Sequence, residues 1–124
     1  MNSIKASFYI LNIFAIADGQ SDPSEITVIF DFLAENFEGE FNLEEEVIFL
    51  DSLSLEEKMQ VFNEAAIYLK NNVSLRSKIN LVEYILDLIV ADNRLEKQEI
   101  QLLDYLGQIW GIDTEQLLRE KLNS

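Results

Sequence analysis

Apolar residues recur along the chain at spacings of three and four, which is the period of one face of an α-helix. Between residues 26 and 37, for example, the apolar side chains stand at positions 26, 29, 30, 33 and 37. No run alternates apolar and polar residues between hairpin turns, as half-buried strands do, and the 124 residues include one proline and four glycines. This pattern predicts an all-α fold, a compact bundle of about seven helices.

The ends of the predicted helices carry recognisable signals. We expect helices over about 3–17, 22–37, 43–51, 54–70, 74–91 and 96–110, with a last short helix near the C-terminus. The start signals are Asp22 followed by Pro23, the capping box of Ser54 and Glu57, Ser74, and Asp113. Gly111 is expected to end the sixth helix. The first helix is apolar nearly all round, which predicts a central position in the bundle.

The amino-acid composition limits the kinds of site that this chain can form. A chain of 124 residues with 48% hydrophobic content is large enough for a single domain, 1–124, with one core. Because it has no cysteine and no histidine, disulfides, thiolate nucleophiles, zinc-finger ligation and imidazole-based triads are excluded. A bound metal would be held by oxygen atoms, which favours calcium, magnesium or manganese. We see no signal peptide and no apolar run long enough to insert in a membrane, so we expect a cytoplasmic protein.

The charge of −14 is unevenly distributed. Residues 1–64 hold 14 acids against Lys5 and Lys58, a net charge of −12, whereas residues 65–124 hold nine acids against seven bases, a net charge of −2. Thirteen acids and no base lie between Lys5 and Lys58. Such a surface repels nucleic acid and anionic membranes and attracts cations or a basic protein. A purely solubilising role of these charges is the alternative.

One short motif occurs twice. The stretch A-D-G-Q-S-D-P-S-E-I at 17–26 returns as A-D-N-R-L-E-K-Q-E-I at 91–100. Each position that the two stretches share lies 74 residues further along the chain in the second copy. Flanking apolar positions match in character as well, with Ile29 aligned to Leu103 and Phe14 to Leu88. We therefore predict two copies of a helical hairpin, about 8–37 and 82–111, related by a pseudo-two-fold axis.

The repeated acids are the candidate site: Asp18, Glu25, Asp92 and Glu99. Each glutamate stands at the third position of a predicted helix, where capping explains it well. Each aspartate ends an apolar helix, where the helix dipole disfavours negative charge. Either backbone amides of the following turn or a divalent cation shared with the glutamate would offset that cost. The eight-residue spacing excludes an EF-hand loop of twelve residues.

On these motifs the chain resembles the TerB-like family, the helical domain of tellurite-resistance proteins that also occurs in a membrane-anchored DnaJ-type co-chaperone. The stretch from Val73 to Asp113 is the more similar half, with a capped helix, an A-D-N turn and a glutamate helix start. The resemblance implies about seven helices, no established enzymatic activity, and a role in stress response, metal sensing or multiprotein assembly. It also implies that the family's acidic positions are Asp18, Glu25, Asp92 and Glu99.

The sequence thus favours a non-enzymatic acidic module that binds a protein partner with a basic surface, with a divalent cation at the paired turns. Two alternatives stay open. One is a metal-dependent carboxylate hydrolase or phosphatase, which would have to work without histidine, cysteine or a phosphate-binding glycine loop. The other is a structural subunit that pairs with itself as a homodimer.

Overall fold

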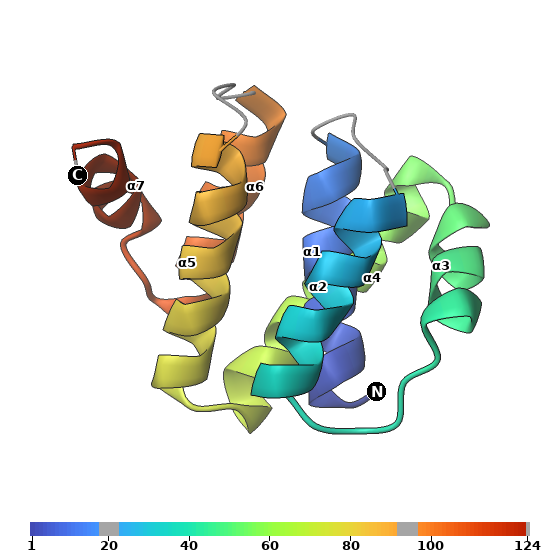
Figure 1. Ribbon diagram of the computed structural model, residues 1–124. Helices are drawn as coiled ribbons and strands as arrows, with labels where there is room; N and C mark the ends of the chain where they lie inside the picture. The colour runs from blue at the N-terminus through green and yellow to red at the C-terminus, as the bar shows by residue number, and fades with distance from the viewer. Residues whose placement is uncertain (18–22, 92–96, 124) are drawn as a thin grey trace.

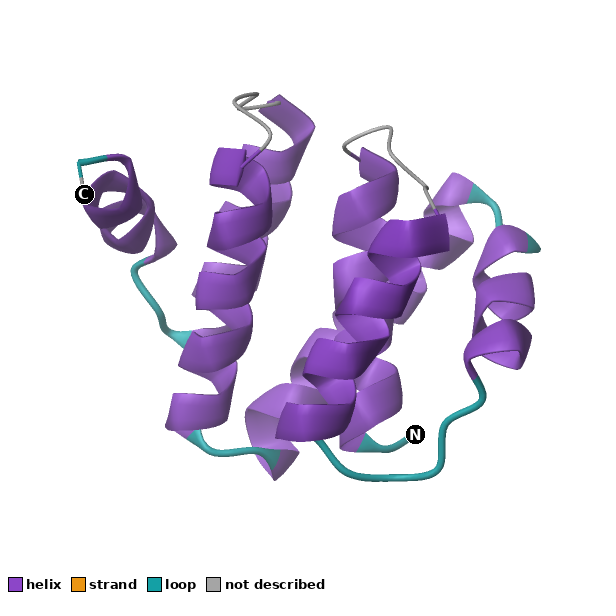
Figure 2. Cartoon of the chain, viewed as in Figure 1, coloured by secondary structure: helices purple, strands orange, loops and turns teal. Residues whose placement is uncertain are grey.

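The computed structural model describes residues 1–17, 23–91 and 97–123, with the side chains of 16–17, 23–27 and 91 left aside. Helices account for nearly all of the described chain, and no strand occurs in it (Figure 2). The helices are α1 (Ser3–Ala17), α2 (Pro23–Asn36), α3 (Leu43–Asp51), α4 (Leu55–Asn72), α5 (Leu75–Ala91), α6 (Lys97–Trp110) and α7 (Thr114–Leu122). The predicted all-α bundle is therefore confirmed, and the predicted helix bounds agree to within about two residues.

Helix α1 is the centre of the bundle, as its apolar surface predicts. It contacts α2, α4, α5 and α6, and its side chains from Ile4 to Phe14 are almost all buried. Figure 1 shows α3 and α7 at opposite edges of the molecule, with the other helices between them. The first and second halves of the chain thus meet along α1, and α3 is left at the margin of the first half.

The predicted start signals act as caps wherever the structure describes them. Ser54 and Glu57 form a capping box at the start of α4, with the Ser54 amide donating to Glu57 Oε1 at 2.9 Å. The Ser74 hydroxyl accepts from the Ser77 amide at 3.1 Å, and Asp113 Oδ1 accepts from the Gln116 amide at 3.0 Å. Each bond satisfies an amide that the first helical turn cannot pair. The Asp22 cap lies outside the described residues.

Helices α6 and α7 meet at a tight joint that depends on glycine. Gly111 ends α6 with a positive φ of 68°, a conformation that L-residues with a side chain adopt at a cost. One turn earlier, a Cβ on Gly107 would come within 2.7 Å of the Ile112 carbonyl oxygen and 2.8 Å of Thr114 Cγ2. The absence of a side chain at Gly107 therefore lets the chain fold back against α6.

Helix α6 is held to α4 by two side-chain hydrogen bonds. The indole of Trp110 is almost buried and donates from Nε1 to the Ala66 carbonyl oxygen at 2.8 Å. The Tyr105 hydroxyl donates to Asn63 Oδ1 at 2.6 Å. Since these residues are 42 and 44 positions apart in the chain, the bonds fix how the second half sits on the first.

The predicted two-fold relation of the hairpins remains a prediction. Ile29 and its counterpart Leu103 are both almost fully buried. Phe14, however, is 3% exposed, whereas its counterpart Leu88 is 37% exposed. The apolar match between the two copies is therefore only partly reflected in burial. Across the described helices, none combines the length and the apolar character needed to cross a membrane.

Candidate functional site

Two of the four predicted cation ligands, Glu25 and Glu99, lie in the first turns of α2 and α6. Asp18 and Asp92 lie outside the described residues, and Glu25 is placed in the first turn of α2 without its side chain. Figure 1 shows the end of α1, the start of α2, the end of α5 and the start of α6 at the same end of the molecule. The two copies of the motif are therefore connected to neighbouring helix ends.

Glu99 is the candidate whose side chain the structure describes. It occupies the third position of α6 and is only 3% exposed. Glu57 occupies the third position of α4 and is an exposed member of a capping box. Hydrogen bonds from the Ser54 backbone amide and hydroxyl lower the pKa of Glu57. The burial of Glu99 thus distinguishes it from Glu57, the exposed glutamate at the matching position of α4.

Burial of a carboxylate is costly unless the charge is matched by hydrogen bonds, a countercharge or a cation. Oxygen donors such as those of Glu99 suit hard divalent cations, so the residue fits the predicted ligand set. Within the described ranges, no three acidic side chains gather closely enough to hold a metal ion.

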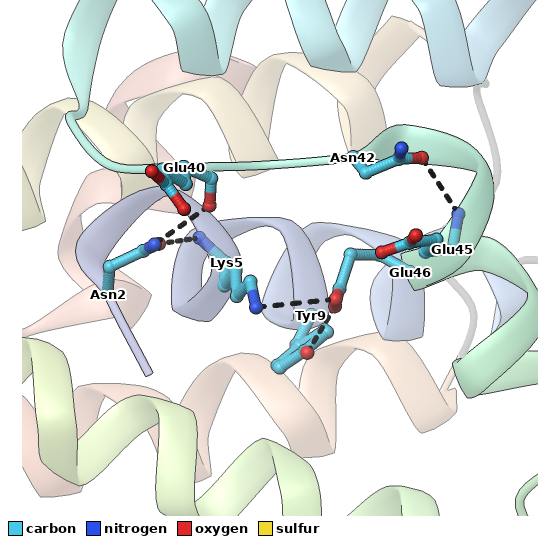
Figure 3. A network of polar contacts seen from close by, with 7 residues as sticks. All are labelled: Asn2, Lys5, Tyr9, Glu40, Asn42, Glu45 and Glu46. Carbon is cyan, nitrogen blue, oxygen red and sulfur yellow. Dashed lines mark hydrogen bonds and ion pairs between the residues drawn. The ribbon is translucent and has the colours of Figure 1, made fainter.

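A second polar cluster lies between α1 and α3 and was not predicted. Glu46 of α3 is 8% exposed and accepts a short hydrogen bond at Oε2 from the Tyr9 hydroxyl (Figure 3). Its other oxygen, Oε1, lies 3.7 Å from Lys5 Nζ. Lys5 and Tyr9 are four residues apart on α1, so that both side chains lie on one face of the helix. The cluster therefore binds the marginal helix α3 to the central helix.

The surroundings of Tyr9 favour its neutral form. Burial raises the pKa of the Tyr9 hydroxyl most, and its hydrogen bond to Glu46 and the charge of Glu46 raise it further. The phenol therefore stays protonated and remains a donor to the carboxylate over the ordinary pH range. One sequence signal pointed to this cluster: Lys5 is the only base among the first 57 residues.

The segment that leads into α3 is tied to the start of α1. The Asn2 amide donates from Nδ2 to the Glu40 carbonyl oxygen at 2.8 Å, and the Ser3 hydroxyl donates to the Glu38 carbonyl oxygen at 3.0 Å. Asn42 then caps α3 by accepting from the Glu45 amide at 3.1 Å. Figure 3 shows the Asn2–Glu40 and Asn42–Glu45 contacts beside the Lys5–Glu46–Tyr9 cluster. Helix α3 is thus held at its start as well as by its buried face.

The exposed acids around α3 form no ion pair with another described residue. Between residues 38 and 57, Glu46 is the one carboxylate that forms an ion pair within the described structure. The exposed acids of this segment are Glu38, Glu40, Glu44, Glu45, Asp51, Glu56 and Glu57. In the second half, by contrast, Arg119 pairs with Glu115 at 2.5 Å and Lys121 with Asp87 at 2.7 Å. The uneven charge of the sequence therefore becomes an uncompensated acidic surface on and beside α3.

These features define the class of the molecule: an all-α bundle with a central apolar helix, an acidic margin and a buried glutamate at a helix start. The family model described as tellurite resistance protein TerB matches residues 5–122, nearly the whole chain. The chain therefore belongs to the TerB family, and the resemblance read from the repeated turns is confirmed. No curated protein and no solved structure matches it.

Proposed function

We propose that this protein is a non-enzymatic TerB-family module of the cytoplasm that binds a protein partner with a basic surface, in a stress response such as tellurite resistance. The observation that carries the proposal is the exposed acidic surface of residues 38–57, in which Glu46 is the one carboxylate that forms an ion pair with a described residue. Membership of the TerB family, which is not a classical enzyme family, supports a binding role.

The physical reason is electrostatic. Like charges held on one surface repel each other, and a surface of opposite charge relieves this repulsion when it binds. The same field repels nucleic acid, so a protein is the partner that fits. We further propose that a divalent cation binds at the turns that carry Asp18, Glu25, Asp92 and Glu99, and the repetition of the same acid spacing in both turns supports this part.

Affinity capture tests the partner. The immobilised protein would be exposed to lysate of its native host at 50 mM NaCl, washed, and eluted with a gradient of NaCl, and the eluted proteins would be identified by mass spectrometry. We expect a small set of proteins with basic surfaces that free module displaces from the matrix and that salt releases. The proposal would be refuted if the captured proteins lack basic surfaces and their binding does not weaken as the NaCl concentration rises.

A matched pair of variants tests whether capture depends on the acidic segment 38–57 or only on the net charge of the protein. The variant Glu38→Gln/Glu40→Gln/Glu56→Gln removes three exposed acids from the acidic segment, and Glu83→Gln/Asp104→Asn/Glu120→Gln removes three exposed acids from the second half. We expect the first variant to lose most of the captured partner and the second to retain it. Equal losses would show that capture reports net charge alone.

A further inference from the structure

Helix α3 exposes large apolar side chains among its acids. Ile48 is 62% exposed and Phe49 is 41% exposed, and Leu55, just beyond the turn that follows the helix, is 76% exposed. Three large apolar side chains thus face solvent within eight positions of the chain. Such a group on the surface of a monomer is characteristic of an interaction site.

The acids lie next to these apolar side chains on the helix surface. Glu44 is four residues before Ile48, and Glu45 is four residues before Phe49. Residues at this spacing are neighbours on an α-helix. The surface of α3 therefore presents Ile48 and Phe49 beside carboxylates, and we call Glu44, Glu45, Ile48 and Phe49, together with Leu55 at the start of α4, the α3 face.

The opposite side of α3 holds the helix firmly. Leu50 is fully buried, and Glu46 is bound by Tyr9 and Lys5. Lys5 is thereby engaged on the inner side of the helix. Phe49 lies at the border of the two sides, because its ring is 5.8 Å from the Tyr9 ring between centroids and the residue is still 41% exposed. Because the helix is already fixed, a ligand that binds the α3 face would lose little free energy in ordering it.

The side chains of the α3 face indicate which class of ligand it can bind. A ligand that covers Ile48 and Leu55 must offer apolar side chains, and one that meets Glu44 and Glu45 must offer lysine or arginine beside them. A helix with apolar residues at spacings of three and four and with basic flanks satisfies both demands at once. A second copy of this chain does not, because a symmetric pairing would bring the acids of both α3 faces together.

We propose that the α3 face is the docking surface of the module and that it binds a basic amphipathic helix of the partner. This inference rests on the proposed function, to which it adds a location and a class of ligand. The apolar side chains of the α3 face supply affinity, and its carboxylates set the orientation and the sensitivity to salt.

Two synthetic peptides test the proposal. The first is an 18-residue peptide of leucine and lysine with leucines at helical spacing, and the second has the same composition in an order without that period. Binding would be measured by fluorescence anisotropy at 50 and 300 mM NaCl, with circular dichroism to follow helix formation. We expect the wild-type protein to bind the amphipathic peptide at least tenfold more tightly than the second peptide and to induce helix in it.

Variants locate the binding surface. Ile48→Ser/Leu55→Ser removes two exposed apolar side chains from the α3 face, and Val28→Ser/Leu75→Ser removes two of similar exposure (58% and 57%) elsewhere. Glu44→Gln/Glu45→Gln and Glu35→Gln/Glu64→Gln form the matched pair for charge. We expect at least a tenfold loss of affinity in the first apolar variant, and a severalfold loss with weaker salt dependence in Glu44→Gln/Glu45→Gln. Both controls should stay within twofold of wild type.

Four results would overturn the inference. Equal binding of the two peptides, or no binding of either, would show that the surface does not recognise an amphipathic helix. Equal losses in the α3 and control variants would place binding elsewhere. A wild-type dimer in sedimentation that Ile48→Ser/Leu55→Ser dissociates would make a second copy the occupant.

The lysate experiment separates failure of this inference from failure of the proposed function. If the α3 variants still capture a basic partner from host lysate, the proposed function stands and the α3 face is wrong. If the wild-type protein captures no basic partner, the proposed function itself is refuted.

Discussion

Glu46 is tolerated inside the protein because two side chains of α1 reach it. The Tyr9 hydroxyl donates to one carboxylate oxygen, and Lys5 lies beside the other. A buried acceptor that loses its donor retains the full cost of desolvation. The hydrogen bond from Tyr9 is therefore worth more to the fold than an exposed ion pair such as Arg119–Glu115.

We expect Tyr9→Phe to lower the free energy of unfolding by about 1–3 kcal/mol, because it leaves the ring in place and removes the donor to Glu46. Urea denaturation followed by circular dichroism measures this. Tyr68→Phe is the control, since no side-chain hydrogen bond of its hydroxyl is seen among the described residues. A loss in Tyr9→Phe no greater than in Tyr68→Phe would show that the bond contributes nothing.

The same tyrosine makes the stability of the fold depend on pH in the alkaline range. Its pKa is raised in the fold above the unfolded value of 10.0, so the stabilisation it provides is complete below pH 10 and is lost as the pH rises above that value. Burial raises the pKa of Tyr84, and the bond to Asp87 raises that of Lys121, so both contribute in the same window. Tyr9→Phe should therefore lose less stability than wild type between pH 10 and 11.5, measured by urea denaturation.

At the scale of elements, the joint between α6 and α7 shows how a close contact overrides helix propensity. Alanine is usually favoured over glycine inside a helix by about 1 kcal/mol. At Gly107 the added methyl group would meet the Ile112 carbonyl oxygen, a backbone atom that cannot rotate away. Helix α7 can pack against α6 because this position carries no side chain.

We therefore expect Gly107→Ala to destabilise the protein by about 1–3 kcal/mol, the usual cost of an overpacked site. Thermal unfolding followed by circular dichroism would show a lower Tm. Gly111→Asn serves as the comparison, because a side chain there meets open space and asparagine tolerates the left-handed conformation. A Gly107→Ala protein as stable as wild type would mean that the joint relaxes freely.

At the scale of the whole molecule, the bundle brings the ends of four helices to the same end. The ends of α1 and α5 lie there together with the starts of α2 and α6 (Figure 1). The protein as a whole carries a charge of −14, so any divalent cation will be attracted to it weakly. A specific site at the turns must be distinguished from this diffuse attraction.

Isothermal titration with calcium, magnesium and manganese makes that distinction. We expect saturable binding of at least one of them to the wild-type protein, and at least a tenfold weaker affinity in Asp18→Asn/Asp92→Asn and in Glu99→Gln. Asp31→Asn/Asp104→Asn removes the same charge as the double variant from exposed helix positions and should bind as wild type does. Equal weakening in all variants would indicate diffuse attraction. A lower Tm without metal, and no heat of binding in wild type, would assign these acids to capping.

Much of the fold was predictable because helix starts and periods are local. Ser54, Ser74 and Asp113 each bond an amide three residues away, and such caps can be read from neighbouring letters of the sequence. The repeat singled out Glu99 as a candidate ligand, but a glutamate at a helix start does not by itself predict burial. The burial of Glu46 was not predicted either, because in the sequence it is one of three consecutive glutamates, Glu44 to Glu46, and nothing local distinguishes it from the other two.

The sequence by itself determined that the chain is helical, where its helices begin and end, that its first half is acidic, and that it resembles the TerB family. Only the tertiary structure decided which charges are buried and which apolar side chains stay in water. Glu46 is inside because Lys5 and Tyr9 approach it from 37 or more positions away, and Ile48, two residues later, is outside. Burial depends on contacts between distant segments, and a local pattern does not contain them.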